Sequence, residues 1–282
     1  MPNIGLIGVE NSHAEHFIRL LNREQRHPPF RLSALAGGTG ERAIALAETG
    51  GIGQIVDNAA DLIGLVDAVI VCSRDGALHR AQAEPLLAAG IPVLVDKPLA
   101  ASIDDADAIL ATARGANTLL YSASALRFTP QTDEVARWVR SSRALRSLHV
   151  SGPADTASPY SGLYFSGIHH VKAALEVLGT DALSELRVAV SRSGDSTVAE
   201  VRIRQVLTML TFVPPSEGRQ IVFRADAVAA GSSWSGDLTL GSDYLAPVLD
   251  RFIAALRTGR APVSHEVMRA PIVVMDAICT AA

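Results

Sequence analysis

Short apolar runs alternate with longer stretches of helical spacing through the first 120 residues, which is how parallel β-α-β units look in a sequence. Runs rich in Ile, Val, Leu and Ala predict strands near residues 4–7, 32–36, 68–72, 93–95 and 118–121. The stretches between them, each bounded by Gly, Pro, Ser or Asp, predict helices near residues 12–22, 41–48, 77–89 and 103–114. In such a doubly wound sheet the ligand lies outside the carboxyl ends of the strands, so the residues after each strand are expected to face it.

The pattern changes near residue 145, where strand-like runs follow one another without helices between them. These runs lie at residues 186–191, 198–213 and 220–228. Successive strands of this kind predict a mostly antiparallel sheet. Three helices are expected beside it, at residues 168–178, 244–258 and 266–281, the first with apolar side chains at i, i+3, i+4 and i+7.

Length and composition indicate two globular domains. The chain has 282 residues, of which 48% are hydrophobic and 19% charged, and a domain averages roughly 150 residues. We expect an α/β domain over residues 1–122 and an α+β domain with an open sheet over residues 123–282. The net charge of −4 argues against nucleic acid as a partner.

Other classes of protein are excluded on similar grounds. No apolar run has the 18 or so residues that a membrane span needs. Two cysteines offer neither a disulfide framework nor a zinc site, and the histidines lack metal-site spacing, so we expect no metal. Met1 leads directly into an apolar segment without a basic signal region, so we expect a cytoplasmic protein.

The turn after the first strand occupies the place of a dinucleotide-binding fingerprint, Gly-x-Gly-x-x-Gly. Glycines there let the backbone approach a pyrophosphate, whose charge the helix N-terminus stabilises. Only the first glycine matches, and a carboxylate in the second place would repel a pyrophosphate. The turn is either a divergent cofactor loop or an ordinary β-α turn capped by Asn11 or Ser12. Its residues are Gly8, Val9, Glu10, Asn11, Ser12 and His13.

The end of the second strand lacks the acid that hydrogen-bonds the ribose in NAD-binding folds. The sequence there is Ala36-Gly37-Gly38-Thr39, and Arg42 follows. Arg42 is a candidate ligand for a 2′-phosphate, which favours NADP as the cofactor. The alternative is that Arg42 is a solvated residue of the first helical turn.

The segment Asp96-Lys97-Pro98 ends a buried strand at the expected ligand-binding edge. Of the 25 basic residues only Lys97 and Lys172 are lysines. A desolvated lysine is able to change its protonation state, whereas arginine is not, and Pro98 fixes one backbone dihedral of the turn. The segment is therefore either a proton-transfer site or a surface turn with an Asp-Lys pair.

A second candidate site begins the helix expected at residues 168–178. His169 lies about 160° from Val171 around that helix, on an expected polar face with Lys172 and Glu176. An imidazole there is a candidate general base, and the alternative is a solvated or helix-capping histidine.

These segments together resemble the Gfo/Idh/MocA family of NAD(P)-dependent sugar, inositol and related dehydrogenases. The matching segments follow the family's order over nearly the whole chain. They are Ile7-Gly8, Glu41-Arg42-Ala43, the run from Asp67 through Ser73 to His79, Ala89 to Leu99 with Asp96-Lys97-Pro98, Leu126-Arg127-Phe128, Gly167-Ile168-His169, and Gly259 to Ser264.

The resemblance implies a Rossmann-type N-terminal domain, and it implies roles for individual residues. Lys97 would contact substrate and nicotinamide ribose and assist proton transfer, and His169 would take a proton from the substrate hydroxyl. Two acids common in the family, four residues before and three after that histidine, are Phe165 and Lys172 here. Further cofactor contacts are expected from Ser73, His79 and Asp96, and substrate contacts from Arg127, Tyr164 and His170.

The leading hypothesis is an NAD(P)-dependent oxidoreductase acting on a secondary alcohol of a sugar, cyclitol or related polyol. Lys97 and His169 would then face one shared pocket. The main alternative is a non-catalytic ligand-binding or sensor protein that has lost the chemistry, and a redox-assisted lyase or hydrolase is a third possibility. The resemblance also implies a homodimer or homotetramer formed through the C-terminal sheet.

Overall fold

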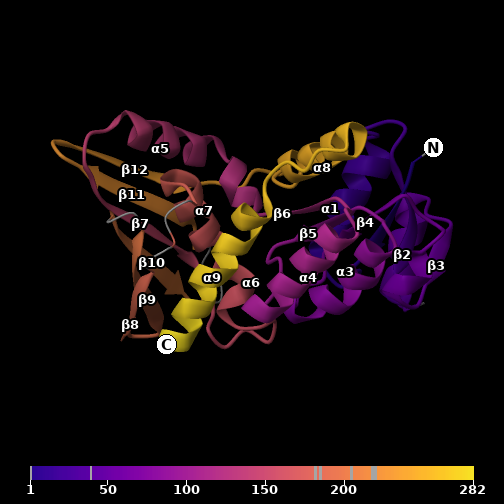
Figure 1. The fold of residues 1–282 in the computed structure, drawn as a ribbon, viewed down its shortest axis with the longest axis horizontal. Coiled ribbons are helices and arrows are strands. Elements are labelled where there is room, and N and C mark those ends of the chain that lie inside the picture. Colours follow the sequence, from indigo (N-terminus) through magenta and orange to yellow (C-terminus); the bar gives the residue numbers. More distant parts are fainter. Residues whose placement is uncertain (1, 39, 181–182, 184–185, 204–205, 217–220) are drawn as a thin grey trace. The chain divides into compact units, whose positions relative to one another are not determined.

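The computed structural model describes residues 2–38, 40–180, 183, 186–203, 206–216 and 221–282. The chain divides into two compact units (Figure 1). The first comprises Met1–Ala123 and Leu245–Met268, and the second comprises Ser124–Tyr244 and Arg269–Ala282. Residues 245–268, which the sequence analysis assigned to the second domain, therefore group with the first unit.

Helix α8 (Ala246–Thr258) explains this grouping. Its Asp250 accepts hydrogen bonds from Arg26, whose Nε and Nη2 lie 2.8 and 2.9 Å from the two carboxylate oxygens. His27 Nε2 lies 2.7 Å from the same carboxylate, and the Arg257 guanidinium lies 5.4 Å from the centre of the Phe30 ring. An exposed ion pair alone contributes little, but the helix also buries an apolar face in this unit.

The first unit is built on a parallel sheet, as expected, and this sheet has six strands where five were predicted. The strand order is β3-β2-β1-β4-β5-β6. The three-residue strand β3 was not predicted, and β6 begins two residues later than expected. The strands are β1 (Asn3–Ile7), β2 (Arg31–Ala36), β3 (Gln54–Val56), β4 (Ala68–Val71), β5 (Val93–Asp96) and β6 (Leu120–Ala123).

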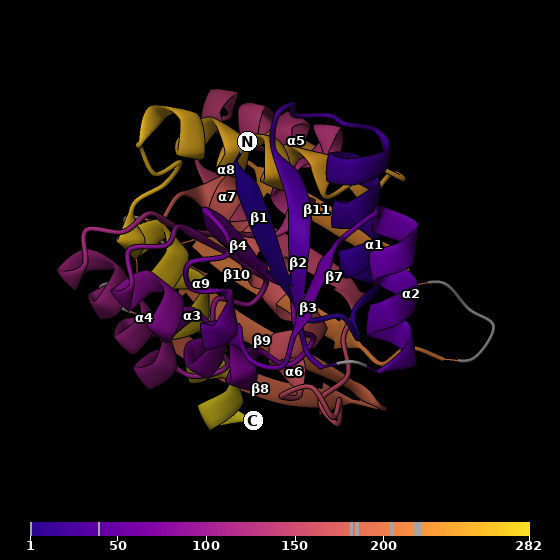
Figure 2. The ribbon, with the colours of Figure 1, turned by 90° about the vertical axis from the view of Figure 1, so that its right-hand side faces the viewer.

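Helices cover both faces of this sheet, with α1 and α2 on one side and α3 and α4 on the other (Figure 2). Strands β4, β5 and β6 are buried at every position, and α3 packs on β4 and β5. The helical segments are α1 (Ser12–Ile18), the π-helix η1 (Arg19–Arg23), α2 (Glu41–Gly50), the 3₁₀ segments η2 (Ala59–Leu62) and η3 (Gly76–Leu78), α3 (His79–Ala88) and α4 (Ile103–Gly115).

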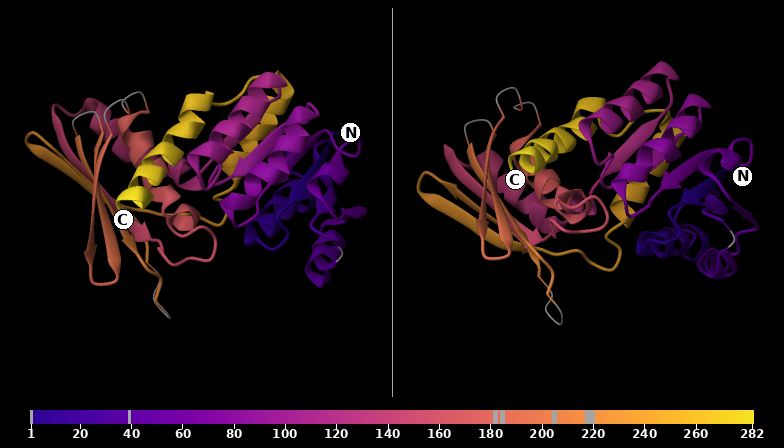
Figure 3. Two further views of the ribbon diagram at one scale, coloured as in Figure 1. Left: turned by 60° about the horizontal axis from the view of Figure 1, so that its bottom comes forward. Right: turned by 90° about the horizontal axis from the view of Figure 1, so that it is seen from below.

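The second unit contains a six-stranded sheet of order β12-β11-β7-β10-β9-β8, whose strands are long and twisted (Figure 3). Only β7 and β10 pair in parallel, so the sheet is mostly antiparallel, as expected. The run expected at 198–213 is two strands; residues 204–205, like residue 220 of the next expected run, lie outside the described residues. The strands are β7 (Leu145–Pro153), β8 (Arg187–Ser193), β9 (Ser196–Ile203), β10 (Val206–Val213), β11 (Phe223–Ala229) and β12 (Ser232–Leu238).

Helix α7 has the bounds that the apolar spacing predicts, and it packs against β7 and β10. Helix α5 was not predicted, although it packs on α7, β11 and β12. No helix among the described residues has the length and apolar character to cross a membrane. The helical segments are η4 (Ala125–Phe128), α5 (Pro130–Ser141), α6 (Leu163–Ser166), α7 (Ile168–Leu178) and α9 (His265–Ala281), whose first four residues group with the first unit.

Candidate active site

The turn after β1 lies directly on the end of β4. Gly8 has a φ of +100°, and a Cβ there would lie 2.3 Å from Ser73 N, so only glycine permits this approach. Asn11 caps α1, because its Oδ1 accepts a hydrogen bond from His13 N at 3.1 Å. Its Nδ2 donates to Cys72 O at 2.7 Å. The capping role considered from the sequence is therefore present, together with the close approach that a phosphate-binding turn needs.

The two residues that replace glycines in this turn extend toward the ends of neighbouring strands. Glu10 Oε1 accepts a hydrogen bond from Arg74 N at 2.9 Å, after β4. His13 Nδ1 lies 2.6 Å from Asp96 Oδ2, at the end of β5. The Glu10 carboxylate is thus occupied by a backbone N–H group. The His13 ring ties the start of α1 to the Asp96-Lys97-Pro98 segment.

Asp96 and Lys97 are both buried, with 2% and 6% of their surfaces exposed. Burial alone would raise the pKa of the Asp96 carboxyl, but the charge and hydrogen bond of His13 and the charge of Lys97 hold that pKa well below its ordinary value. Burial lowers the pKa of the Lys97 ammonium; Asp96 opposes this shift and the Arg74 guanidinium adds to it. Lys97 is therefore an amine whose proton is easier to remove than that of an exposed lysine.

His79 and Ser73 join the loops after β4 and β5. The fully buried His79 ring lies 2.8 Å from Pro98 O through Nδ1 and 2.9 Å from Ser73 O through Nε2. Ser73 Oγ donates to Gln82 Oε1 at 3.0 Å. His79 thus holds the turn that carries Lys97, and it has no exposed surface with which to contact a cofactor edge.

Gly37 and Gly38 follow β2, and both N–H groups donate to Val56 O at 3.1 Å. A Cβ at Gly38 would lie 3.9 Å from Asp57 Oδ1. The end of β3 therefore provides a carboxylate beside the position where β2 lacks one, which the sequence analysis missed because β3 was not foreseen.

Arg42 lies in the first turn of helix α2. Its Nε donates to Val9 O at 2.5 Å, and its Nη2 lies 3.2 Å from the Glu15 carboxylate. The guanidinium is about half exposed, so it stays a candidate for binding a 2′-phosphate.

These residues are compatible with a dinucleotide at the carboxyl edge of the first sheet. Gly8 lets the turn lie directly against the end of β4, and Gly38 leaves space beside the backbone, where a Cβ would meet nothing nearer than Asp57 Oδ1 at 3.9 Å. Arg74 and Lys97 contribute positive charge, which offsets the negative charge of Glu10 toward a pyrophosphate. That Val9, Ser12 and Asp96 contact a cofactor stays a prediction.

His169 is half-buried at the start of α7 in the second unit. Its Nδ1 lies 2.6 Å from Ser124 Oγ, and its ring meets the Phe223 ring edge-on at 5.5 Å. Ser124 is fully buried and was not singled out from the sequence. No sequence signal marks it, because the contact joins residues 45 positions apart.

Three further residues expected at the substrate site have partners within the second unit. Arg127 donates through Nε to Glu176 Oε2 at 2.7 Å. Tyr164 is 7% exposed, and its hydroxyl lies 3.5 Å from Asp276 Oδ1. Burial raises the pKa of that hydroxyl, so it is a proton donor and not a phenolate. Whether Arg127 and Tyr164 contact substrate stays a prediction.

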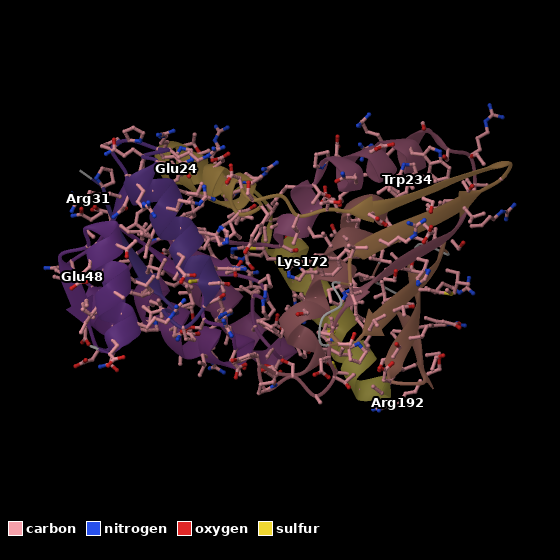
Figure 4. All side chains as sticks on the ribbon, turned by 180° about the vertical axis from the view of Figure 1, so that it is seen from behind. Glu24, Arg31, Glu48, Lys172, Arg192 and Trp234 are labelled. Carbon is pink, nitrogen blue, oxygen red and sulfur yellow. The ribbon has the colours of Figure 1, made fainter. Side chains whose placement is uncertain are left out.

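The expectation that His170 contacts substrate is wrong, because its ring has no exposed surface. It packs edge-on against Phe212 and Phe223 at 4.8 and 5.2 Å. Lys172 is 2% exposed, so the polar face expected for α7 is also wrong at that position (Figure 4). Both errors have the same cause: α7 is covered nearly all round, which helical periodicity cannot reveal.

No three His, Cys, Asp or Glu side chains within the described ranges are grouped as ligands of a metal ion. Lys97 belongs to the first unit and His169 to the second. That they share one pocket stays a prediction.

Comparisons with known proteins show which proteins this chain resembles. Residues 2–124 match the model of the Gfo/Idh/MocA oxidoreductase family, described as having an NAD-binding Rossmann fold. The YceM protein of Salmonella typhimurium is 32% identical over 164 residues, which is 57% of this chain and 52% of that protein. A 1,5-anhydro-D-fructose reductase of Ensifer adhaerens is 34% identical over 129 residues, which is 45% of this chain and 37% of the reductase. The matched segments thus span about half or less of these relatives.

Solved structures share the fold over the whole chain. GenD2 from gentamicin A biosynthesis, solved in complex with NAD, has a TM-score of 0.85 at 16% identity. The match covers 100% of this chain and 94% of the GenD2 chain. The UDP-N-acetylglucosamine 3-dehydrogenase GnnA of Acidithiobacillus ferrooxidans has a TM-score of 0.80 at 19% identity, covering 99% and 97%. Residues 2–124 are thus similar to the Gfo/Idh/MocA oxidoreductase family, and the fold of the whole chain is that of the solved structures.

Proposed function

We propose that the protein is an NAD(P)-dependent dehydrogenase or reductase that interconverts a secondary alcohol and a ketone on a sugar, cyclitol or related polyol. The observation that carries this proposal is Lys97, a buried amine of lowered pKa at the carboxyl edge of a sheet whose family binds NAD. The relatives named for sugar substrates support the polyol class.

A bound nicotinamide supplies or accepts the hydride, and the chain positions the reactants and handles the protons. The turn from Gly8 to His13 and the glycines after β2 would hold the dinucleotide. Lys97 would exchange a proton with the substrate oxygen. His13 keeps the Asp96 carboxylate ionised beside Lys97, which helps to hold the amine in its charged form until the proton leaves.

The decisive experiment is cofactor binding followed by turnover. Thermal shift and nicotinamide fluorescence are measured with NADH and with NADPH. Both cofactors are tested because the preference for NADP depends on Arg42. Activity is then measured on a polyol and ketose panel that includes 1,5-anhydro-D-fructose. Lys97→Ala should bind cofactor and lose about 100-fold or more in turnover. Absence of any response to either cofactor would refute the proposal.

A non-catalytic sensor is the second candidate, favoured by Phe165 and Lys172 at positions where acids were expected. Cofactor binding without turnover on the whole panel, with ligand binding unaffected by Lys97→Ala, would support it.

We also propose a homodimer or homotetramer formed through the sheet of the second unit. Alternate residues of β10, Leu207, Met209, Thr211 and Val213, are only half-buried, which leaves a partly apolar face. Light scattering after size-exclusion chromatography measures the mass, and Met209→Asp should lower it; a monomer would refute this arrangement.

A further inference from the structure

The hydrogen-bonding capacity of Ser124 restricts the protonation state of His169. A serine hydroxyl has one proton to donate and two lone pairs that accept. Ser124 Oγ accepts a hydrogen bond from Leu126 N at 3.3 Å and lies 2.6 Å from His169 Nδ1. Within the part of the chain that the structure describes, these are the contacts of this hydroxyl, which is fully buried.

Two arrangements of protons are possible in this pair. If Nδ1 carries a proton, Ser124 Oγ must accept from both Nδ1–H and Leu126 N–H, and the hydroxyl proton is left without an acceptor in a buried place. If Nδ1 is unprotonated, Ser124 donates to it and still accepts from Leu126, so the hydroxyl, Nδ1 and the Leu126 N–H group are all satisfied. An unsatisfied buried donor is costly, so the second arrangement is the stable one.

The two positions where acids are common in the family offer no acceptor that competes with Ser124. Phe165 lacks polar side-chain atoms, and Lys172 has an ammonium that only donates. An acid at either place would favour a proton on Nδ1 or a doubly protonated ring. Neither Phe165 nor Lys172 favours a proton on Nδ1, and Ser124 favours an unprotonated Nδ1.

We propose that Ser124 holds His169 neutral with its proton on Nε2, so that His169 donates a hydrogen bond to the substrate oxygen and does not act as the general base. This inference rests on the proposed function. During reduction of a ketone the hydride forms the new C–H bond, and the π electron pair of the carbonyl moves to oxygen. The Nε2–H group stabilises that negative charge, as a neutral imidazole donor is able to do.

The proton that finally binds this oxygen then comes from water or from an acid other than His169. His169 keeps its proton throughout. Ser124 is thus a positioning residue, because it acts through His169 and not on the reacting atoms.

The experiment is an NMR measurement of the His169 ring in the full-length protein without ligand. Long-range ¹H–¹⁵N correlation spectra of ¹⁵N-labelled protein are recorded at about pH 8, above the ordinary histidine pKa. His169→Gln identifies the signals of this ring by their loss. The expected spectrum shows Nδ1 at the shift of an unprotonated nitrogen and Nε2 at the shift of a protonated one.

Two variants test the role of Ser124. Ser124→Thr keeps the hydroxyl and should keep this signature, whereas Ser124→Ala removes the donor and should move both nitrogens toward the averaged shifts of a mixture of tautomers. A proton on Nδ1 in the wild type, or a Ser124→Ala spectrum like that of the wild type, overturns the inference; should the alanine variant not fold, the wild-type spectrum decides.

The two proposals fail differently. An Nε2–H ring in a protein without turnover on the panel would refute the proposed function and leave the ring state as inferred. An Nδ1–H ring in an active enzyme would refute this inference alone.

Discussion

Acid should destabilise this protein through His170, whose ring is buried against Phe212 and Phe223. Neither ring nitrogen has a hydrogen-bond partner among the described residues. Burial lowers the pKa of this imidazole to about 4, whereas an unfolded chain has a histidine pKa of about 6.5.

The sign follows from which state binds the proton. Above about pH 6.5 neither state is protonated at this ring, so it contributes no pH dependence. Between pH 6.5 and 4 the unfolded chain binds a proton and the folded one does not, so the free energy of unfolding falls as the pH falls. Below pH 4 both states are protonated and the loss is complete.

The magnitude comes from the difference in pKa. Each unit corresponds to about 1.4 kcal/mol, so the loss is about 2 kcal/mol at pH 5 and about 3 kcal/mol below pH 4. This is a large fraction of the 5–15 kcal/mol that is typical of a folded domain.

The assay is urea unfolding of wild type and His170→Leu at pH 7 and pH 5, followed by tryptophan fluorescence. Trp138 and Trp234 both lie in the second unit, as His170 does. The leucine variant should lose about 2 kcal/mol less than the wild type between the two pH values. The other seven histidines are common to both proteins, so equal losses in the two would refute the reasoning.

Three further predictions concern the first unit. Gly8→Ala would place a Cβ 2.3 Å from Ser73 N at a φ of +100°; it should lower the melting temperature and abolish the thermal shift caused by NADH, and an unchanged shift would contradict the close approach. Asp57→Asn removes the carboxylate beside Gly38, so it should improve NADPH binding relative to NADH about tenfold in fluorescence titrations, while Asp61→Asn, in the 3₁₀ segment η2 that follows, should not. His13→Ala leaves the buried Asp96 carboxylate without its 2.6 Å partner and should destabilise the protein by about 3 kcal/mol in urea unfolding. A double variant with Asp96→Asn should lose much less than the two single changes combined, and additive losses would show that the pair does not interact.

The alternation of apolar runs was sufficient to predict most of the first sheet, because buried parallel strands are continuous apolar segments. It missed β3, since three residues are too few to show a period, and it missed α5 although its apolar residues repeat with helical spacing. The bounds of α7 were predicted correctly, but the burial of its residues His170 and Lys172 was not.

The candidate site was predicted in part for a similar reason. Strand ends identified Lys97, Asp96 and the Gly8 turn, because parallel strands place their carboxyl ends at one edge. The partners of these residues depend on contacts between distant segments. Glu10 with Arg74 N, His13 with Asp96 and Ser124 with His169 are separated by 45 to 83 positions, and no local pattern reports such pairs.

The late return of the chain to the first unit affects its synthesis. A ribosome that adds about 5–20 residues per second completes β6 several seconds before it reaches α8. Until Asp250 emerges, Arg26 and His27 lack the carboxylate that they bind in the finished protein. During that interval the nascent first sheet exposes the surface that α8 later covers. A fragment that stops at Ala123 should share this weakness.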